Sequence, residues 1–164
     1  MKLAQCIILD LLKDYDPVPL LPETCNFHFS GVQLLDQDNP TDDPSILYIG
    51  TTTQISSFNT EKLKDFCIIC IGKKEDVSSY IKNYQANLIL IPENHSLASI
   101  VNTLYTGFHR ILNWDGELQN AILRKQNYQS LFSIGGRFFG KNAMIMVNSS
   151  YNVIGTNLLE APTH

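Results

Sequence analysis

The sequence is poor in charged residues and has no excess of basic ones. Only 17% of its 164 residues are charged, and 12 Lys and Arg against 16 Asp and Glu give a formal net charge of -4. The basic residues are scattered, which removes the simplest argument for nucleic-acid binding by this segment. A hydrophobic content of 44% is ordinary for a globular protein. The chain is long enough to bury a core without disulfides or metals.

Long hydrophobic runs are also missing. No apolar stretch approaches the roughly 20 residues that a membrane helix needs. The apolar start of the chain is interrupted by Asp10, Lys13 and Asp14 and has no small-residue cleavage site, so we do not interpret it as a signal peptide. We expect a cytoplasmic protein without a membrane partner.

The cysteines are few and lack the regular spacing of a secreted disulfide framework. Cys67 and Cys70 have the spacing of a redox or metal motif. A reactive pair needs a helix N-terminus to lower a thiol pKa, whereas this pair lies in an apolar run that predicts a strand. An odd separation in a strand sends the two side chains to opposite faces. We interpret both as buried structural cysteines.

The clearest fold signal is a set of three short, continuous apolar runs at residues 46–49, 66–71 and 88–91. Such runs are typical of strands covered on both faces, as in parallel sheets. The intervening segments, 55–65 and 76–84, have a helical composition. Their lengths are near those that a right-handed crossover between parallel strands requires. The sequence therefore predicts an α/β fold, with a small parallel sheet in three layers.

The residues before these runs predict less regular structure. A helix is expected over Leu3–Tyr15, where apolar residues recur at helical spacing. Residues 17–22 contain three prolines and predict an irregular connector. Residues 26–35 predict a strand bent at Ser30-Gly31. The acidic, proline-containing segment 36–45 is the best candidate for a mobile loop.

A long helix is predicted to begin after Ser96, a good N-cap residue. In a helix of this length one face often covers a sheet while another meets a partner. We therefore predict a homodimer, with plain core packing as the alternative. Trp114-Asp115-Gly116 is expected to kink or divide the helix. The predicted dimerisation residues follow a spacing close to a coiled-coil seam and are Leu97, Val101, Leu104, Phe108 and Ile111.

The end of the chain predicts a β-hairpin, with strands at 143–147 and 151–155 around a polar turn. Nothing obvious completes its sheet. We therefore predict an α/β input domain over 1–95, a connecting and dimerisation helix over 96–127, and a partial second domain over 128–164. Further sequence or another chain would complete that second domain.

The order of these elements carries a family resemblance. Two strand–helix units precede a helix with Phe108-His109-Arg110-Ile111-Leu112-Asn113-Trp114, and a further helix leads into the hairpin at 144–157. This pattern resembles the N-terminal sensory region of bacterial PucR/CdaR-type transcription regulators, most usefully over residues 95–157. The hairpin is similar to the opening of a PAS or GAF sensor domain, with Asn157 in the place of an Asn after the second strand. The resemblance rests on pattern and implies that DNA is bound by a helix-turn-helix domain outside this sequence.

Three loops follow the three predicted parallel strands, and ligands of such sheets bind beyond the carboxyl ends of the strands. Backbone N–H groups, hydroxyls and a lysine there could hold a small anionic metabolite. Gly50 belongs to no complete phosphate-loop or dinucleotide fingerprint, so plain turn and cap residues are the alternative. The candidate ligand-binding residues are Gly50, Thr51, Thr52, Gly72, Lys73, Glu93 and His95.

Residues for catalysis are not recognisable. His95 adjoins Ser96, but no acidic residue at a recognisable spacing completes a triad. The other histidines form no metal-ligand pattern, and we expect no metal, no cofactor and no enzymatic activity. The predicted function is the signal-input and dimerisation region of a bacterial transcription regulator, with a small-molecule effector. The alternatives are a ligand-free assembly scaffold and, less favoured, a small enzyme acting on a phosphorylated substrate through Lys73 or Lys74.

Overall fold

The computed structural model describes residues 2–20, 27–35, 43–56, 65–139 and 145–156. The chain divides into two compact units. Unit 1 comprises Met1–Phe108 and unit 2 comprises His109–His164. Helix α4 (Leu97–Leu123) supplies residues to both.

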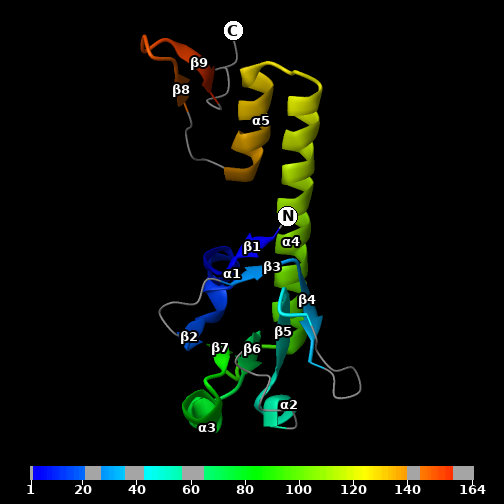
Figure 1. Ribbon diagram of the computed structural model, residues 1–164, viewed down its shortest axis with the longest axis vertical. Coiled ribbons are helices and arrows are strands. Elements are labelled where there is room, and N and C mark those ends of the chain that lie inside the picture. Colours follow the sequence, from blue (N-terminus) through cyan, green and yellow to red (C-terminus); the bar gives the residue numbers. More distant parts are fainter. Residues whose placement is uncertain (1, 21–26, 36–42, 57–64, 140–144, 157–164) are drawn as a thin grey trace. The chain divides into compact units, whose positions relative to one another are not determined.

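Unit 1 is built on a five-stranded sheet with the order β2-β7-β6-β5-β4. Strands β4 to β7 are parallel, and β2 runs antiparallel to β7. This arrangement confirms the predicted α/β class and its mostly parallel sheet (Figure 1). The bounds are β2 (Val18–Leu20), β4 (Gly31–Leu34), β5 (Ile46–Thr51), β6 (Cys67–Ile71) and β7 (Asn87–Ile91).

The central strands are almost entirely apolar because both faces of the sheet are covered. On one face lie α2 (Thr52–Ser56), which follows β5, and α3 (Lys74–Tyr84), which follows β6. Ile55 of α2 and Val77 of α3 belong to one buried cluster with side chains of β5, β6 and β7. The next residues along the same strands, such as Ile69 and Ile89, point to the other face and are equally buried.

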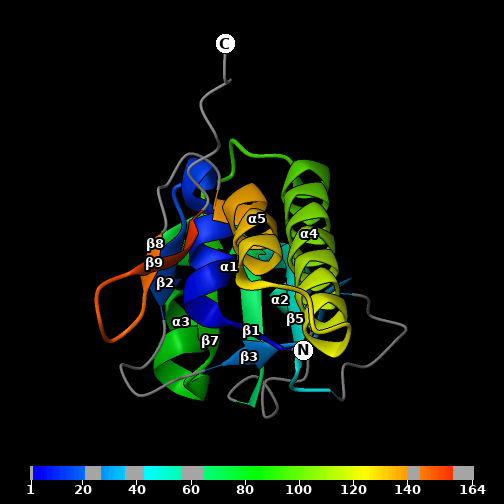
Figure 2. The same cartoon turned by 90° about the horizontal axis from the view of Figure 1, so that it is seen from above.

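That other face is covered by α1 (Gln5–Leu11) and the first part of α4. Ile8, Leu12, Ile100 and Leu104 of this layer are fully buried. The two helices pack closely, because a Cβ at Gly107 would lie 2.6 Å from Leu11 Cδ1. Figure 2 shows both helices on the same side of the sheet. The core of unit 1 therefore has the predicted three layers.

Two predictions before the sheet are corrected by strand pairing. Leu3–Ala4 form a short strand, β1, against β3 (His28–Phe29), so the first helix begins at Gln5 instead of Leu3. A single turn of 3-10 helix, η1, follows at Lys13–Tyr15. The expected irregular connector instead contains β2, in which Pro19 lies opposite Ile89. A proline is tolerated there because β2 is an edge strand, where a missing N–H need not break the ladder.

The expected break at Trp114–Gly116 is wrong, because α4 is helical from Leu97 to Leu123. A single exposed glycine costs a helix only about 1 kcal/mol relative to alanine. The actual end lies further on, where Lys125 has a left-handed φ of 51° and Gln126 N–H donates to Ala121 O. This is the usual way in which a helix satisfies its last carbonyls.

Unit 2 consists of the second part of α4, helix α5 (Tyr128–Phe139) and the hairpin β8 (Ile145–Val147) and β9 (Val153–Thr156). Asn127 begins α5 as an N-cap, because its Oδ1 accepts a 2.9 Å hydrogen bond from Ser130 N–H. The hairpin is antiparallel, as predicted.

Helix α5 packs against β9 and holds its outer edge. A Cβ at Gly155 would lie 2.5 Å from Phe132 Cδ2. The Gln129 amide donates to Thr156 O at 2.8 Å and accepts from Thr156 N–H at 3.4 Å. The Gln129 side chain thus occupies the N–H and C=O groups of Thr156 that another strand could otherwise pair with.

Some predictions fall outside the described residues. These are most of the expected mobile loop (36–42), most of the helix expected over 55–65 (57–64), and Asn157. In the described part of the chain, no helix is long and apolar enough to cross a membrane.

Candidate functional site

The loops after β5, β6 and β7 meet at the carboxyl edge of the sheet, as their order predicts. Gly72 contacts the side chain of Thr52, and Lys73 Nζ lies 3.3 Å from Glu93 Oε1. The predicted ligand-binding residues after neighbouring strands therefore do lie together. The ion pair is exposed on both sides, where such pairs contribute little to stability.

The same loops are closed by side chains of the chain itself. Leu35 fills the space beside Gly50, because a Cβ at Gly50 would lie 2.6 Å from Leu35 Cδ1. Thr51 N–H donates to Gln54 Oε1 at 2.9 Å, and the Gln54 amide donates to Leu35 O at 3.2 Å. The Thr51 N–H, one of the backbone donors that the sequence offered to an anion, is therefore already occupied by Gln54.

His95 takes part in a packed aromatic contact at this edge. Its ring meets the Tyr15 ring edge-on, with 5.1 Å between centroids. The Tyr15 hydroxyl lies 2.8 Å from both Ser99 Oγ and Thr103 Oγ1 on α4. Tyr15 and His95 thus join η1 to the start of α4. Among the described residues, no group of three His, Cys, Asp or Glu is arranged to hold a metal ion.

Cys67 and Cys70 are both fully buried in β6, and neither takes part in a disulfide. Cys70 belongs to the cluster beneath α2 and α3, whereas Cys67 does not, which agrees with opposite faces. Burial raises the pKa of the Cys70 thiol to about 12, with a smaller contribution from Asp76. A thiol with such a pKa stays protonated and is a poor nucleophile.

The predicted dimerisation residues lie largely inside a single chain. Leu104, Phe108 and Ile111 are buried, and Leu97 and Val101 are half-buried. The exposed large apolar side chains of α4 are instead Tyr105, Leu112, Ile122 and Leu123.

A pocket of about 190 Å³ lies within unit 2, between α4 and α5. Its residues from α4 recur at the spacing of one helix face, and those from α5 do the same. The lining residues are Arg110, Asn113, Trp114 and Glu117 from α4 and Ile134, Arg137 and Phe138 from α5.

The pocket combines an aromatic pair with two guanidinium groups. The rings of Trp114 and Phe138 stack with 4.4 Å between centroids and 21° between planes. The Arg110 guanidinium carbon lies 5.6 Å from the centroid of the Phe138 ring, within the range of a cation–π contact. The site can therefore hold a flat apolar group beside a positive charge.

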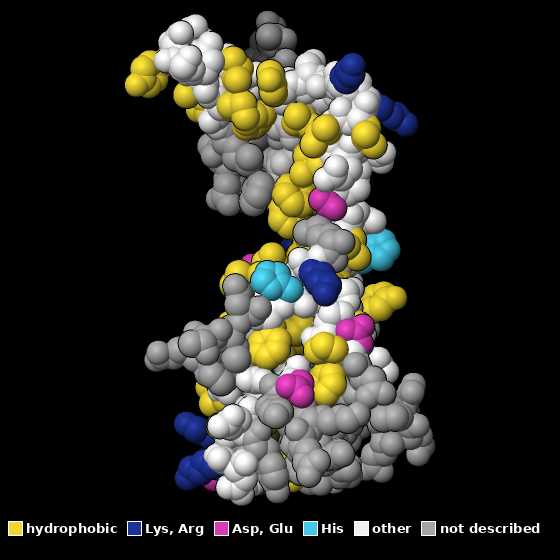
Figure 3. Space-filling view, in the orientation of Figure 1, with side chains coloured by type: hydrophobic (Ala, Val, Ile, Leu, Met, Phe, Trp, Pro, Cys, Tyr) yellow, Lys and Arg dark blue, Asp and Glu magenta, His cyan; other side chains and the backbone are white. Residues whose placement is uncertain are grey.

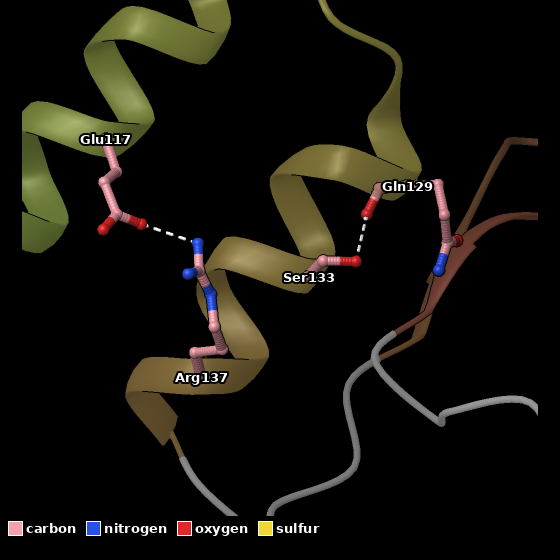
Figure 4. A network of polar contacts seen from close by, with 4 residues as sticks. All are labelled: Glu117, Gln129, Ser133 and Arg137. Carbon is pink, nitrogen blue, oxygen red and sulfur yellow. Dashed lines mark hydrogen bonds and ion pairs between the residues drawn. The ribbon is translucent and has the colours of Figure 1, made fainter.

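An ion pair fixes the other guanidinium. Arg137 Nη2 lies 2.6 Å from Glu117 Oε2 and joins α5 to α4 (Figure 4). In the turn above, Ser133 Oγ donates to Gln129 O at 3.0 Å (Figure 4). The side chain of Gln129 continues to Thr156, so one side of α5 faces α4 and another faces the hairpin.

The sequence prediction did not find this pocket. The spacing of Arg110, Asn113, Trp114 and Glu117 places them on one helix face, which was the available signal. The expected break at Gly116 obscured it, because a divided helix would not align these residues. The partner residues on α5 depend on how two helices pack, which spacing alone does not give.

No known protein family, curated protein or solved structure is similar enough to match this chain.

Proposed function

We propose that this chain is a non-catalytic assembly and signal-input module that forms a homodimer through unit 2. The single observation that carries the proposal is the apolar surface of unit 2. Its members are exposed on α4, α5 and the hairpin, and they are Leu112, Ile122, Leu123, Tyr128, Ile145, Met146, Val147, Tyr151, Val153 and Ile154.

Figure 3 shows hydrophobic side chains gathered on one face of unit 2, over the hairpin and the two helices. The hairpin is the most exposed part, because Tyr151 is 87% exposed and Val153 60%. A two-stranded sheet with bare apolar side chains is marginally stable in water. Covering it with a second apolar surface stabilises both.

The amount of apolar surface fits a dimer. If each of these ten side chains exposes on the order of 70 Å², they present on the order of 700 Å², near the roughly 800 Å² per partner of a standard interface. Apolar patches on monomers are usually about 300–600 Å². A second copy is the occupant we propose, since two-fold association of identical chains is the commonest kind.

The regulatory part of the proposal is supported by the resemblance of residues 95–157 to the sensory region of PucR/CdaR-type transcription regulators. In that setting this chain forms the input region of a bacterial cytoplasmic regulator. DNA is then bound by a domain outside this sequence. The net charge of -4 agrees with this, because DNA-binding domains are usually basic.

Sedimentation equilibrium tests the dimer. We expect twice the monomer mass at about 50 µM and reversible dissociation on dilution, with a Kd on the order of 1–10 µM. Val147→Glu places a charge on the apolar surface and should weaken association at least ~10-fold.

Tyr105→Glu is the matched control, because Tyr105 is an exposed apolar residue of α4 that lies in unit 1. It should leave the dimer unchanged. A monomer at ~100 µM, or equal weakening by both variants, would contradict a dimer through unit 2.

A further inference from the structure

We propose that the pocket between α4 and α5 binds a small carboxylate with a flat apolar body, such as an arylcarboxylate. This assigns a ligand class to a site that dimerisation does not require.

Three of the lining residues are apolar, and two of them are aromatic. Ile134 is buried, Trp114 and Phe138 are half-buried, and the two rings are nearly parallel. Aromatic surfaces of this kind favour another planar group in stacked or edge-on contact. A ring is therefore a better fit than a flexible aliphatic chain.

The charge in the pocket selects an anion. Arg137 is already paired with Glu117. Arg110 makes no ion pair with any described residue, and its guanidinium lies over Phe138. A guanidinium held in this way presents parallel N–H donors to a carboxylate. Arg110 is thus the group that we assign to the carboxylate.

The balance of charge favours a single negative charge on the ligand. Two arginines and one glutamate line the pocket, which leaves one positive charge uncompensated. A monoanion neutralises it, whereas a cation would be repelled by Arg110. Asn113, whose amide nitrogen lies 2.8 Å from His109 Nδ1, adds an amide to the lining.

The volume limits the ligand to about one ring. At about 190 Å³ the pocket is smaller than the roughly 300–1,000 Å³ of drug-sized sites. A ligand of this size makes few contacts, so we expect a Kd on the order of 0.1–1 mM.

The single tryptophan of the sequence provides the test, because all tryptophan fluorescence comes from Trp114 in the pocket wall. Benzoate is titrated into the full chain, with benzamide as the neutral analogue of the same shape. We expect a saturable emission change with benzoate and at least ~10-fold weaker binding of benzamide. N-acetyltryptophanamide corrects for direct quenching.

Arg110→Gln should weaken benzoate binding at least ~10-fold. The control is Arg124→Gln, because Arg124 is an exposed arginine of the same unit that does not line the pocket. Circular dichroism verifies that both variants fold. No saturable response to ~20 mM benzoate, equal binding of benzamide, or an unchanged affinity in Arg110→Gln would overturn the assignment. The dimer is tested by molar mass and the ligand by fluorescence. Failure of one proposal is therefore distinguishable from failure of the other.

Discussion

Gly155 of β9 lies directly against the ring of Phe132 of α5. A Cβ at Gly155 would meet Phe132 Cδ2 at 2.5 Å, closer than real Cβ atoms approach. Gly155→Ala should therefore separate the hairpin from α5 and lower the free energy of unfolding by about 1–3 kcal/mol. Urea unfolding followed by circular dichroism measures the change. A stability equal to that of the wild type would mean that the hairpin does not pack on Phe132.

Gly116 provides the opposite case, because a Cβ there would meet nothing within 4 Å. Gly116→Ala should stabilise the protein by about 0.5–1 kcal/mol, since alanine loses less backbone entropy in a helix. The midpoint of urea unfolding should rise and helical circular dichroism should not fall. Destabilisation would indicate a bend at this position and contradict a continuous α4.

The stacked pair of Trp114 and Phe138 should contribute to the stability of unit 2. Phe138→Ala removes a half-buried ring and should cost about 1–3 kcal/mol, less than a fully buried phenylalanine. The emission of Trp114 should move to longer wavelength as its ring becomes more exposed to water. Phe138→Leu keeps most of the apolar volume and should lose less stability.

The cysteines should differ sharply in reactivity. Cys6 is exposed, whereas Cys67 and Cys70 are fully buried. A thiol reagent at pH 8 should label Cys6 rapidly and reach Cys67 and Cys70 only as the chain unfolds. Mass mapping of labelled peptides follows each site. Rapid labelling of Cys70 in the folded chain would contradict its burial in β6.

Cys70 also gives a direction to the pH dependence of stability. Its folded pKa of about 12 lies above the ordinary value of 9.0, so the folded state holds the proton more tightly. The corresponding stability is complete below pH 9 and is lost as the pH rises toward 12. Cys70→Ala should therefore show a flatter decline in stability than the wild type between pH 9 and 11, measured by urea unfolding.

Two contacts at the carboxyl edge of the sheet should differ in how much they contribute to stability. Gly72→Ala should destabilise unit 1 by about 1–3 kcal/mol, because the new methyl group would collide with Thr52. Lys73→Ala breaks only an exposed ion pair with Glu93 and should change stability by less than about 0.5 kcal/mol. Urea unfolding compares the two. Equal effects would mean that Thr52 moves aside easily.

The parallel sheet could be predicted because its strands are buried on both faces. Continuous apolar runs such as 67–71 are typical of strands that helices cover on both sides, and the run itself carries that information. Strand β2 could not be predicted in the same way. It is a three-residue edge strand containing Pro19, and its pairing with β7 depends on residues about 70 positions away.

The candidate sites show the same limit. The meeting of Thr52, Gly72 and Glu93 follows from strand order, and the sequence predicted it. Strand order does not tell whether space for a ligand remains between these residues. That depends on Leu35 and Gln54, which approach from other parts of unit 1. The pocket beside Trp114 likewise depends on the packing of α5 against α4.

The contact between Gln129 and Thr156 has a consequence for how copies of this chain could grow into larger assemblies. Among the described residues, β8 pairs only with β9, while the far side of β9 is held by a glutamine amide. If β8 pairs with β8 of a second copy, both outer strands of the joined sheet are β9 strands, each held by Gln129 of its own chain. Strand addition at this hairpin would thus stop at two copies instead of continuing into a fibre.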